Sequence, residues 1–148
     1  MRNFITISLV MILAGMPGCK TLQGTTGTRK FVIILQAGTE SHEGLARAVH
    51  ALMYSAELLE AGHKVVLIFD GAGTEWAKAL RDPQHRLHST YQKLAALGAI
   101  EEVCDFCSGA FGVKEELTKF GQVPLVGTYN GHPSLAKWIN SGYTVIVL

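Results

Sequence analysis

The chain has 148 residues, of which 48% are hydrophobic, and this is enough for one globular domain with an ordinary apolar core. Its 13 basic and 12 acidic residues leave a formal net charge of +1, with no local cluster of lysine and arginine. Binding to the phosphates of a nucleic acid requires a basic surface, so the composition argues against nucleic acid as a partner.

Residues 1–18 are typical of an export signal. Arg2 supplies a positive charge, and an uncharged, mainly apolar run follows over residues 4–14. A helix over this run would be about 16 Å long, which is too short for the roughly 30 Å core of a bilayer. The pattern therefore predicts a cleaved secretory signal and not a membrane-spanning helix.

Cys19 indicates a lipid anchor. Gly18-Cys19 resembles the lipobox of bacterial lipoproteins, in which a small residue precedes a cysteine that receives lipid and becomes the first residue of the mature protein. Met16 replaces the usual leucine and Pro17 is an unusual neighbour, so a plain cleaved signal is the alternative. The lipoprotein interpretation predicts an exported, periplasmic protein that meets the membrane only through lipid at Cys19, with residues 19–29 as a flexible tether.

From residue 30 onward, strand patterns alternate with helix patterns. Continuous apolar runs predict buried strands over residues 31–35 and 65–69, and the helical pattern over 43–61 ends at Gly62. The other predicted elements are a short helix around residues 76–80, a helix over 87–97, a strand over 99–103, a helix from about 109 to 120, a strand over 123–126, a helix after Pro133 and a strand over 143–148.

This alternation predicts an α/β fold with a parallel sheet covered on both faces by helices. Ligands of such sheets bind beyond the carboxyl ends of the strands. The loops at 36–42, 70–74, 104–109 and 128–133 all follow predicted strands, so we expect them to share one edge of the sheet.

Two thiols stand at one of these loops. Cys104 ends a predicted strand, and Cys107 follows it ahead of the predicted helix, whose apolar stripe is Val113, Leu117 and Phe120. A thiol just ahead of a helix faces unpaired backbone N–H groups and the positive end of the helix dipole, which favour the reactive thiolate. An oxidising compartment would allow a disulfide between the two cysteines and a reducing one would hold two thiols, and the sequence is compatible with both states.

Taken together, residues 30–148 resemble the DsrE/DsrF-like family, which includes sulfur-relay subunits used in tRNA thiolation and proteins of dissimilatory sulfur oxidation. The resemblance is carried by the strands at 31–35 and 65–70, by Glu60-Ala61-Gly62-His63, by Val103-Cys104 with Gly112-Val113 behind it, by Gly131-His132-Pro133-Ser134 and by Gly142-Tyr143-Thr144-Val145-Ile146. It implies a three-layer α/β/α sandwich with a five-stranded, mainly parallel sheet, and assembly into homo-oligomers. It also places Cys104 at the sulfur-carrying position of the relay subunits, although Cys107 departs from their pattern.

The function predicted from these features is an exported, thiol-based sulfur-handling protein, either a persulfide carrier or a weak sulfurtransferase. Cys104 would hold the sulfur, Cys107 would resolve the persulfide, and His132 would assist proton transfer unless it only shapes its turn. The partners would be a small sulfur donor or an acceptor protein. The alternative is a non-enzymatic domain that binds a small ligand or other protein chains, with the two thiols as a structural or redox-sensing pair.

No cofactor or metal is predicted. His85 and His88 have the spacing to complete a Cys₂His₂ zinc site with the two thiols, but no feature of the sequence brings the two pairs together, so surface histidines are the simpler interpretation. The loop at 38–41 lacks the glycines and the lysine of a phosphate-binding loop. Residues 70–73 are predicted to form a plain turn.

Overall fold

The computed structural model describes residues 27–148. The predicted export signal at 1–18 and the predicted lipid site at Cys19 lie outside these residues, as does most of the predicted tether. Within the described part, no helix combines the length and the apolar character needed to cross a bilayer.

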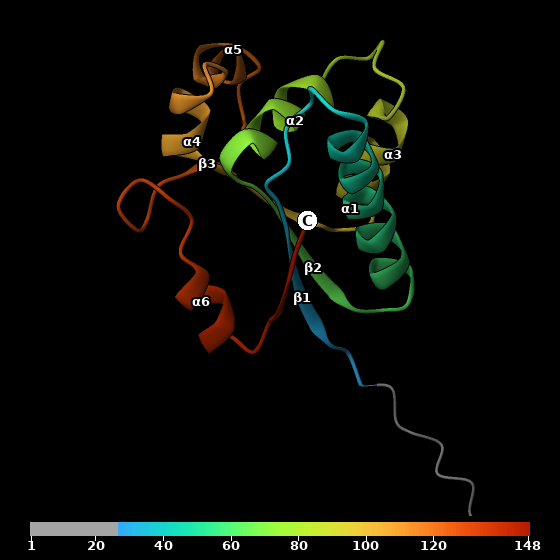
Figure 1. The fold of residues 1–148 in the computed structure, drawn as a ribbon. Helices are drawn as coiled ribbons and strands as arrows, with labels where there is room; N and C mark the ends of the chain where they lie inside the picture. Colours follow the sequence, from blue (N-terminus) through green and yellow to red (C-terminus); the bar gives the residue numbers. More distant parts are fainter. Residues whose placement is uncertain (1–26) are drawn as a thin grey trace, which may run out of the picture.

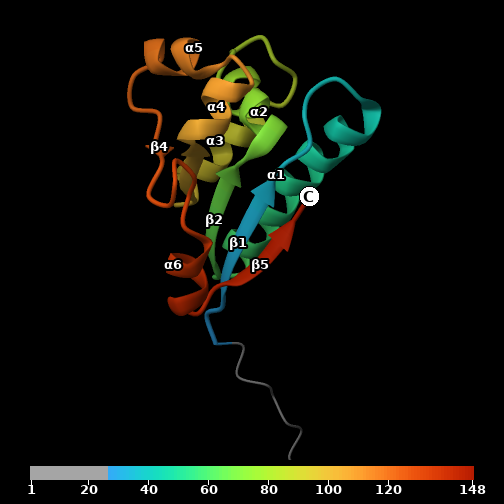
Figure 2. The ribbon, with the colours of Figure 1, turned by 60° about the vertical axis from the view of Figure 1, so that its left-hand side comes forward.

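A five-stranded sheet forms the centre of the domain, and every pair of neighbouring strands in it is parallel. The strands lie in the order β4-β3-β2-β1-β5, and the arrowheads of β1, β2 and β5 point the same way in Figure 2. Their bounds are β1 Lys30–Leu35, β2 Lys64–Phe69, β3 Ile100–Cys104, β4 Leu125–Val126 and β5 Thr144–Val147. The predicted five-stranded α/β fold is confirmed, and the sheet is wholly parallel.

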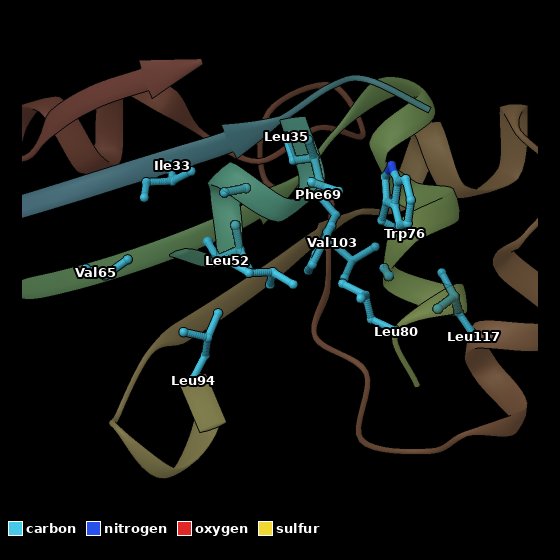
Figure 3. Close-up of a cluster of buried hydrophobic side chains, with 14 of the residues drawn as sticks. Ile33, Leu35, Leu52, Val65, Phe69, Trp76, Leu80, Leu94, Val103 and Leu117 are labelled. Atoms are coloured by element: carbon cyan, nitrogen blue, oxygen red, sulfur yellow. The ribbon is translucent and has the colours of Figure 1, made fainter. Parts of the chain in front are cut away.

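One face of the sheet carries the larger core. Helices α1 (His42–Glu60), α2 (Thr74–Ala79) and α3 (His88–Ala96) pack there, as Figure 3 shows for Leu52, Trp76 and Leu94. A single 3₁₀ turn, η1 (Gly71–Gly73), leads from β2 into α2. Alternate side chains of a strand point to opposite faces, so Ile33 faces this core while its neighbours in β1 face the other side. The apolar runs of β1 and β2 are thus explained by burial on both faces.

The opposite face is covered by α6 (Leu135–Asn140), which lies across the sheet from α1 in Figure 1. Trp138 of α6 packs on this face of β1 and β2. Its Nε1 also donates a hydrogen bond of 3.1 Å to the buried Glu102, which accepts a second one of 2.8 Å from Lys137 Nζ. A buried carboxylate needs such partners, so these contacts attach α6 to β3 and form the third layer.

The single helix predicted over about 109–120 is wrong. Helix α4 (Asp105–Ala110) begins directly after Cys104, and α5 (Lys114–Lys119) follows as a separate helix. Gly112 lies between them in the left-handed conformation, with φ of 69°, which ends α4 because a helix cannot continue through that conformation. Leu117 is buried as predicted, whereas Phe120 is half-exposed.

Candidate functional site

The loops after β2, β3 and β4 meet at one edge of the sheet, as the sequence predicts. They bring together one side-chain atom each from Asp70, Cys104, Cys107 and His132, and all four atoms lie within 4.8 Å of one another. In Figure 2 this edge lies beyond the arrowheads of the strands, where α2 and α4 begin. The three residues that the sequence assigns to sulfur chemistry are therefore neighbours in space.

Cys104 is the last residue of β3 and also the N-cap of α4. Its Sγ accepts a hydrogen bond of 3.3 Å from the backbone N–H of Cys107, and its side chain is fully buried. Burial raises the pKa of the Cys104 thiol, and the neighbouring Cys107 and Asp70 raise it further. The start of a helix is expected to lower the pKa of a thiol, so the shift at Cys104 has the opposite direction. Removal of the thiol from solvent raises the pKa by more than the hydrogen bond from the N–H of Cys107 lowers it.

Cys107 lies in the first turn of α4, and 7% of its surface is exposed. Its thiol donates a hydrogen bond of 3.3 Å to Oδ1 of Asp70. Both Cys104 and Cys107 are free thiols in the structure, with no disulfide between them. The structure thus shows the dithiol form of the pair.

His132 reaches the thiols from a tight turn after β4. Its backbone exchanges two hydrogen bonds with Tyr129, of 2.9 and 2.8 Å, and between them Asn130 and Gly131 have φ of 48° and 85°. Positive φ at both central residues is the geometry of the Asn-Gly hairpin turn. His132 Nδ1 lies 3.2 Å from Sγ of Cys104 and 3.6 Å from Sγ of Cys107. The histidine therefore belongs to a turn and also contacts both sulfurs.

The turn is attached to the thiol segment by two contacts. The backbone N–H of Phe106 donates a hydrogen bond of 2.9 Å to Gly131, and its ring lies 4.9 Å from the imidazole of His132. These contacts tie the turn to the start of α4 and hold the imidazole close to both sulfurs.

Asp70 is the fourth member of the cluster, although the sequence predicts only a plain turn at residues 70–73. It follows β2 directly, and its Oδ2 accepts a hydrogen bond of 2.9 Å from Gln36 Nε2. Burial alone would raise its pKa, but hydrogen bonds from Gln36 and the two thiols hold the pKa of this carboxyl below its usual value. Its position in the sequence could have indicated this role, because an acidic residue directly after a buried parallel strand lies at the edge of the sheet where ligands bind.

A cavity of about 250 Å³ opens beside the cluster. Gln36, Asp70 and His132 supply its polar wall, and Ile34, Ile68, Pro133, Leu135 and Val147 supply the rest. This volume is below the usual range for drug-sized ligands and suits a small inorganic or thiol-sized molecule.

The two histidines considered for a zinc site lie elsewhere. His85 packs edge-on against Trp76, with ring centroids 5.9 Å apart, and His88 Nδ1 contacts the backbone oxygen of Leu80 at 2.8 Å. Neither belongs to the group of residues that includes the two thiols. The ligands available for a metal in residues 27–148 are instead those of Asp70, Cys104, Cys107 and His132.

Comparisons with known proteins agree with this architecture. The model of the DsrE/DsrF-like family matches residues 29–148. Uncharacterized protein MJ0733 of Methanocaldococcus jannaschii is 36% identical over 100 residues, which are 68% of this chain and 78% of that protein. The solved structure of BT1422, a conserved protein of unknown function from Bacteroides thetaiotaomicron, superposes on this chain with a TM-score of 0.54. The superposition covers 80% of this chain and 94% of the BT1422 chain. The two sequences are 16% identical, so the similarity concerns the fold alone.

A further match is partial. The UDP-N-acetylglucosamine--N-acetylmuramyl-(pentapeptide) pyrophosphoryl-undecaprenol N-acetylglucosamine transferase of Rhodospirillum centenum is 32% identical over 104 residues, which are 70% of this chain. Those residues are 26% of the transferase, so the similarity concerns about a quarter of that protein.

Proposed function

The chain belongs to the DsrE/DsrF-like family, and on this premise we propose that it is a thiol-based sulfur-handling protein that carries sulfur as a persulfide on Cys104. It would act as a sulfur carrier or as a weak sulfurtransferase. The observation that supports this most is the 3.2 Å contact between Sγ of Cys104 and Nδ1 of His132, with a second thiol beside them. A nucleophilic sulfur with an adjacent base is the arrangement that activates a cysteine.

Loading begins with a small persulfide or polysulfide donor in the cavity beside His132. Nδ1 of His132 accepts the Cys104 proton, in the tautomer that carries its own proton on Nε2, as Sγ attacks the terminal sulfur of the donor. A new S–S bond forms on Cys104 and the S–S bond of the donor breaks. A persulfide donor leaves as a thiolate and a polysulfide donor as hydrosulfide or a shorter polysulfide. The leaving anion takes up the proton from His132, so the step needs no external oxidant.

Two routes release the sulfur. Cys104 is fully buried, so the first route requires the turn at 128–133 to move aside. A thiolate of an acceptor protein then attacks the outer sulfur, which transfers that sulfur and returns Cys104 as a thiolate. Alternatively, Sγ of Cys107, within 4.8 Å, attacks the inner sulfur and expels hydrosulfide. That second route oxidises the two thiols to a disulfide and reduces the carried sulfur, so a dithiol reductant must then restore the pair.

Substitution of the two thiols tests the proposal. After reduction and exposure to polysulfide, the wild-type chain should gain sulfur-sized mass increments at Cys104, detected by intact-mass and peptide mass spectrometry. Cys104→Ser should form no stable adduct, because the attacking sulfur is lost. Cys107→Ser should keep the adduct several times longer, because the resolving thiol is gone.

The controls concern the base and the fold. His132→Gln should slow loading by about 100-fold, the usual size of a general-base contribution, while its circular dichroism stays native. If the adduct persists in Cys104→Ser and vanishes in Cys107→Ser, the two roles are exchanged. If neither thiol takes up sulfur, the carrier function fails and a non-enzymatic binding or redox-sensing domain replaces it.

We also propose an exported, periplasmic location with a lipid anchor at Cys19, which rests on the apolar run at 4–14 and on Gly18-Cys19. Self-association of the domain belongs to the same proposal. The half-exposed apolar side chains of Phe106, Leu135 and Ile139 support it, since a surface rich in such groups favours contact with another chain.

The lipid anchor predicts a specific labelling pattern. In a bacterial host grown with labelled palmitate, the wild-type chain should incorporate the label and Cys19→Ser should not, because lipid is attached through that sulfur. Cys107→Ser serves as the matched control and should label like the wild type. Equal labelling of the wild type and Cys19→Ser, or a mature mass that corresponds to cleavage at another position, would rule out the anchor.

A further inference from the structure

We propose that the reduced site binds one thiophilic divalent cation of the zinc class. The ligands would be Sγ of Cys104, Sγ of Cys107, Nδ1 of His132 and a carboxylate oxygen of Asp70. This inference goes beyond sulfur carriage and does not depend on it, since it rests on the geometry and chemistry of four side chains.

Three of the distances between the ligand atoms are close to those of a four-coordinate site. With metal–sulfur bonds of about 2.3 Å and metal–nitrogen or metal–oxygen bonds of about 2.0–2.1 Å, sulfur lies about 3.5 Å from nitrogen or oxygen in a tetrahedron. The structure has Nδ1 of His132 at 3.2 and 3.6 Å from the two sulfurs, and Oδ1 of Asp70 at 3.3 Å from Sγ of Cys107. These three distances lie within a few tenths of an ångström of that value, and all four ligand atoms lie within 4.8 Å of one another, so shifts of up to about 1 Å would place them around one ion.

The set of ligands selects the class of metal. Two thiolates and one imidazole suit zinc and its close relatives, whereas magnesium and calcium prefer oxygen ligands throughout. Binding of the cation displaces the two thiol protons to solvent, and no group is oxidised or reduced.

Neighbouring groups already hold the ligands in place. Gln36 Nε2 fixes the second oxygen of Asp70 at 2.9 Å, and the N–H of Cys107 points at Sγ of Cys104. The hydrogen bond from Phe106 to Gly131 holds the turn that carries His132. Support of this kind orients ligands in protein metal sites, and the cavity beside Asp70 and His132 gives the ion an entry path.

Cobalt(II) titration of the full chain, reduced and kept free of oxygen, tests the site. Co²⁺ is the probe because tetrahedral thiolate coordination produces intense visible bands and a sulfur-to-metal charge-transfer band. We expect one Co²⁺ per chain, displaced by one equivalent of Zn²⁺. Cys104→Ser and Cys107→Ser should each weaken the charge-transfer band to about half, and each should lower the affinity by about 100-fold or more.

The remaining variants separate this site from adventitious binding. Asp70→Asn and His132→Gln should also lower the affinity by at least about 10-fold. His85→Gln and Asp105→Asn are matched controls, because each changes a residue of the same type outside the four ligands, and both should bind Co²⁺ like the wild type. Circular dichroism of each metal-free variant verifies the fold. Absence of the charge-transfer band in the wild type, or an affinity that is unchanged in Cys107→Ser and His132→Gln, overturns the proposal.

Persulfide loading measured with and without metal keeps the two proposals distinct. Both need Cys104 Sγ, so one equivalent of Zn²⁺ should suppress polysulfide loading by about 10-fold or more, and a chelator should restore it. Loading in the presence of a chelator together with no Co²⁺ binding would overturn the metal site alone. Co²⁺ binding by a protein that never forms a persulfide would overturn the carrier function alone.

Discussion

The Ile33→Asp and Leu67→Asp variants are expected to be unfolded. The two residues are partners in the register of β1 and β2, and they are 0% and 2% exposed beneath the larger helical layer. A carboxylate at either position has no charged or hydrogen-bonding partner among the apolar side chains there, and burying one costs several kcal/mol. Because a domain of this size is stable by only about 5–15 kcal/mol, that cost removes most of its stability.

Circular dichroism and thermal denaturation measure this effect. Ile100→Asp is the matched control, because it introduces the same charge into β3 at a side chain that is 47% exposed, and it should keep a native spectrum. Native spectra and unchanged melting temperatures for both Ile33→Asp and Leu67→Asp would contradict the burial of the strand pair.

Gly73→Ala should strongly destabilise the domain and also disturb the site. A Cβ on Gly73 would lie 1.9 Å from the backbone oxygen of Leu35, which is far inside van der Waals contact with backbone that cannot rotate away. The same oxygen accepts a hydrogen bond of 3.0 Å from the backbone N–H of Asp70. Relief of the clash must therefore move either the end of β1 or the loop that carries Asp70. We expect a loss of about 3 kcal/mol or more, since such overpacking displaces backbone.

A loss of that size lowers the melting temperature by roughly 10 °C in a domain of this length. The affinity for Co²⁺ should fall as well, because Asp70 moves with its loop. Gly109→Ala in α4 is the control: the nearest atom to its added methyl group is Lys114 Cδ at 4.0 Å, and alanine is the better helix former, so its stability should be equal or higher. If Gly73→Ala melts like the wild type, the close contact between η1 and β1 is incorrect.

Much of the fold could be predicted because its signals are local. The run at 31–35 is apolar at every position, as burial on both faces of a parallel sheet requires, and Gly62 ends the long helix in the left-handed conformation, with φ of 81°. The region after Cys104 was predicted poorly for an equally local reason. Cysteine is not a usual N-cap residue, so the start of α4 carries no recognisable signal. The apolar stripe formed by Val113, Leu117 and Phe120 favours one longer helix, although Gly112 ends α4.

The candidate site could be predicted only in part from the sequence. The spacing of Cys104 and Cys107 made the pair visible in the sequence, because residues three apart across the start of a helix are neighbours. Asp70 and His132 are distant from them along the chain, and only the adjacency of β2, β3 and β4 brings the ends of those strands together. The sequence places these loops at one edge and proposes His132 as a partner of the thiols, but only the structure shows that Asp70 joins them.

The protonation of Cys104 also depends on both the sequence and the tertiary structure. The chain order alone placed a thiol ahead of a helix, where backbone N–H groups lower its pKa. Packing of the loops against β3 removes this thiol from solvent, and the resulting desolvation raises the pKa instead. The sequence by itself thus determined which side chains can react, namely the two thiols. Burial, and the side chains that other strands bring close, determined how strongly the Cys104 thiol holds its proton. The reason is that access to solvent depends on how the layers pack and not on neighbouring residues in the chain.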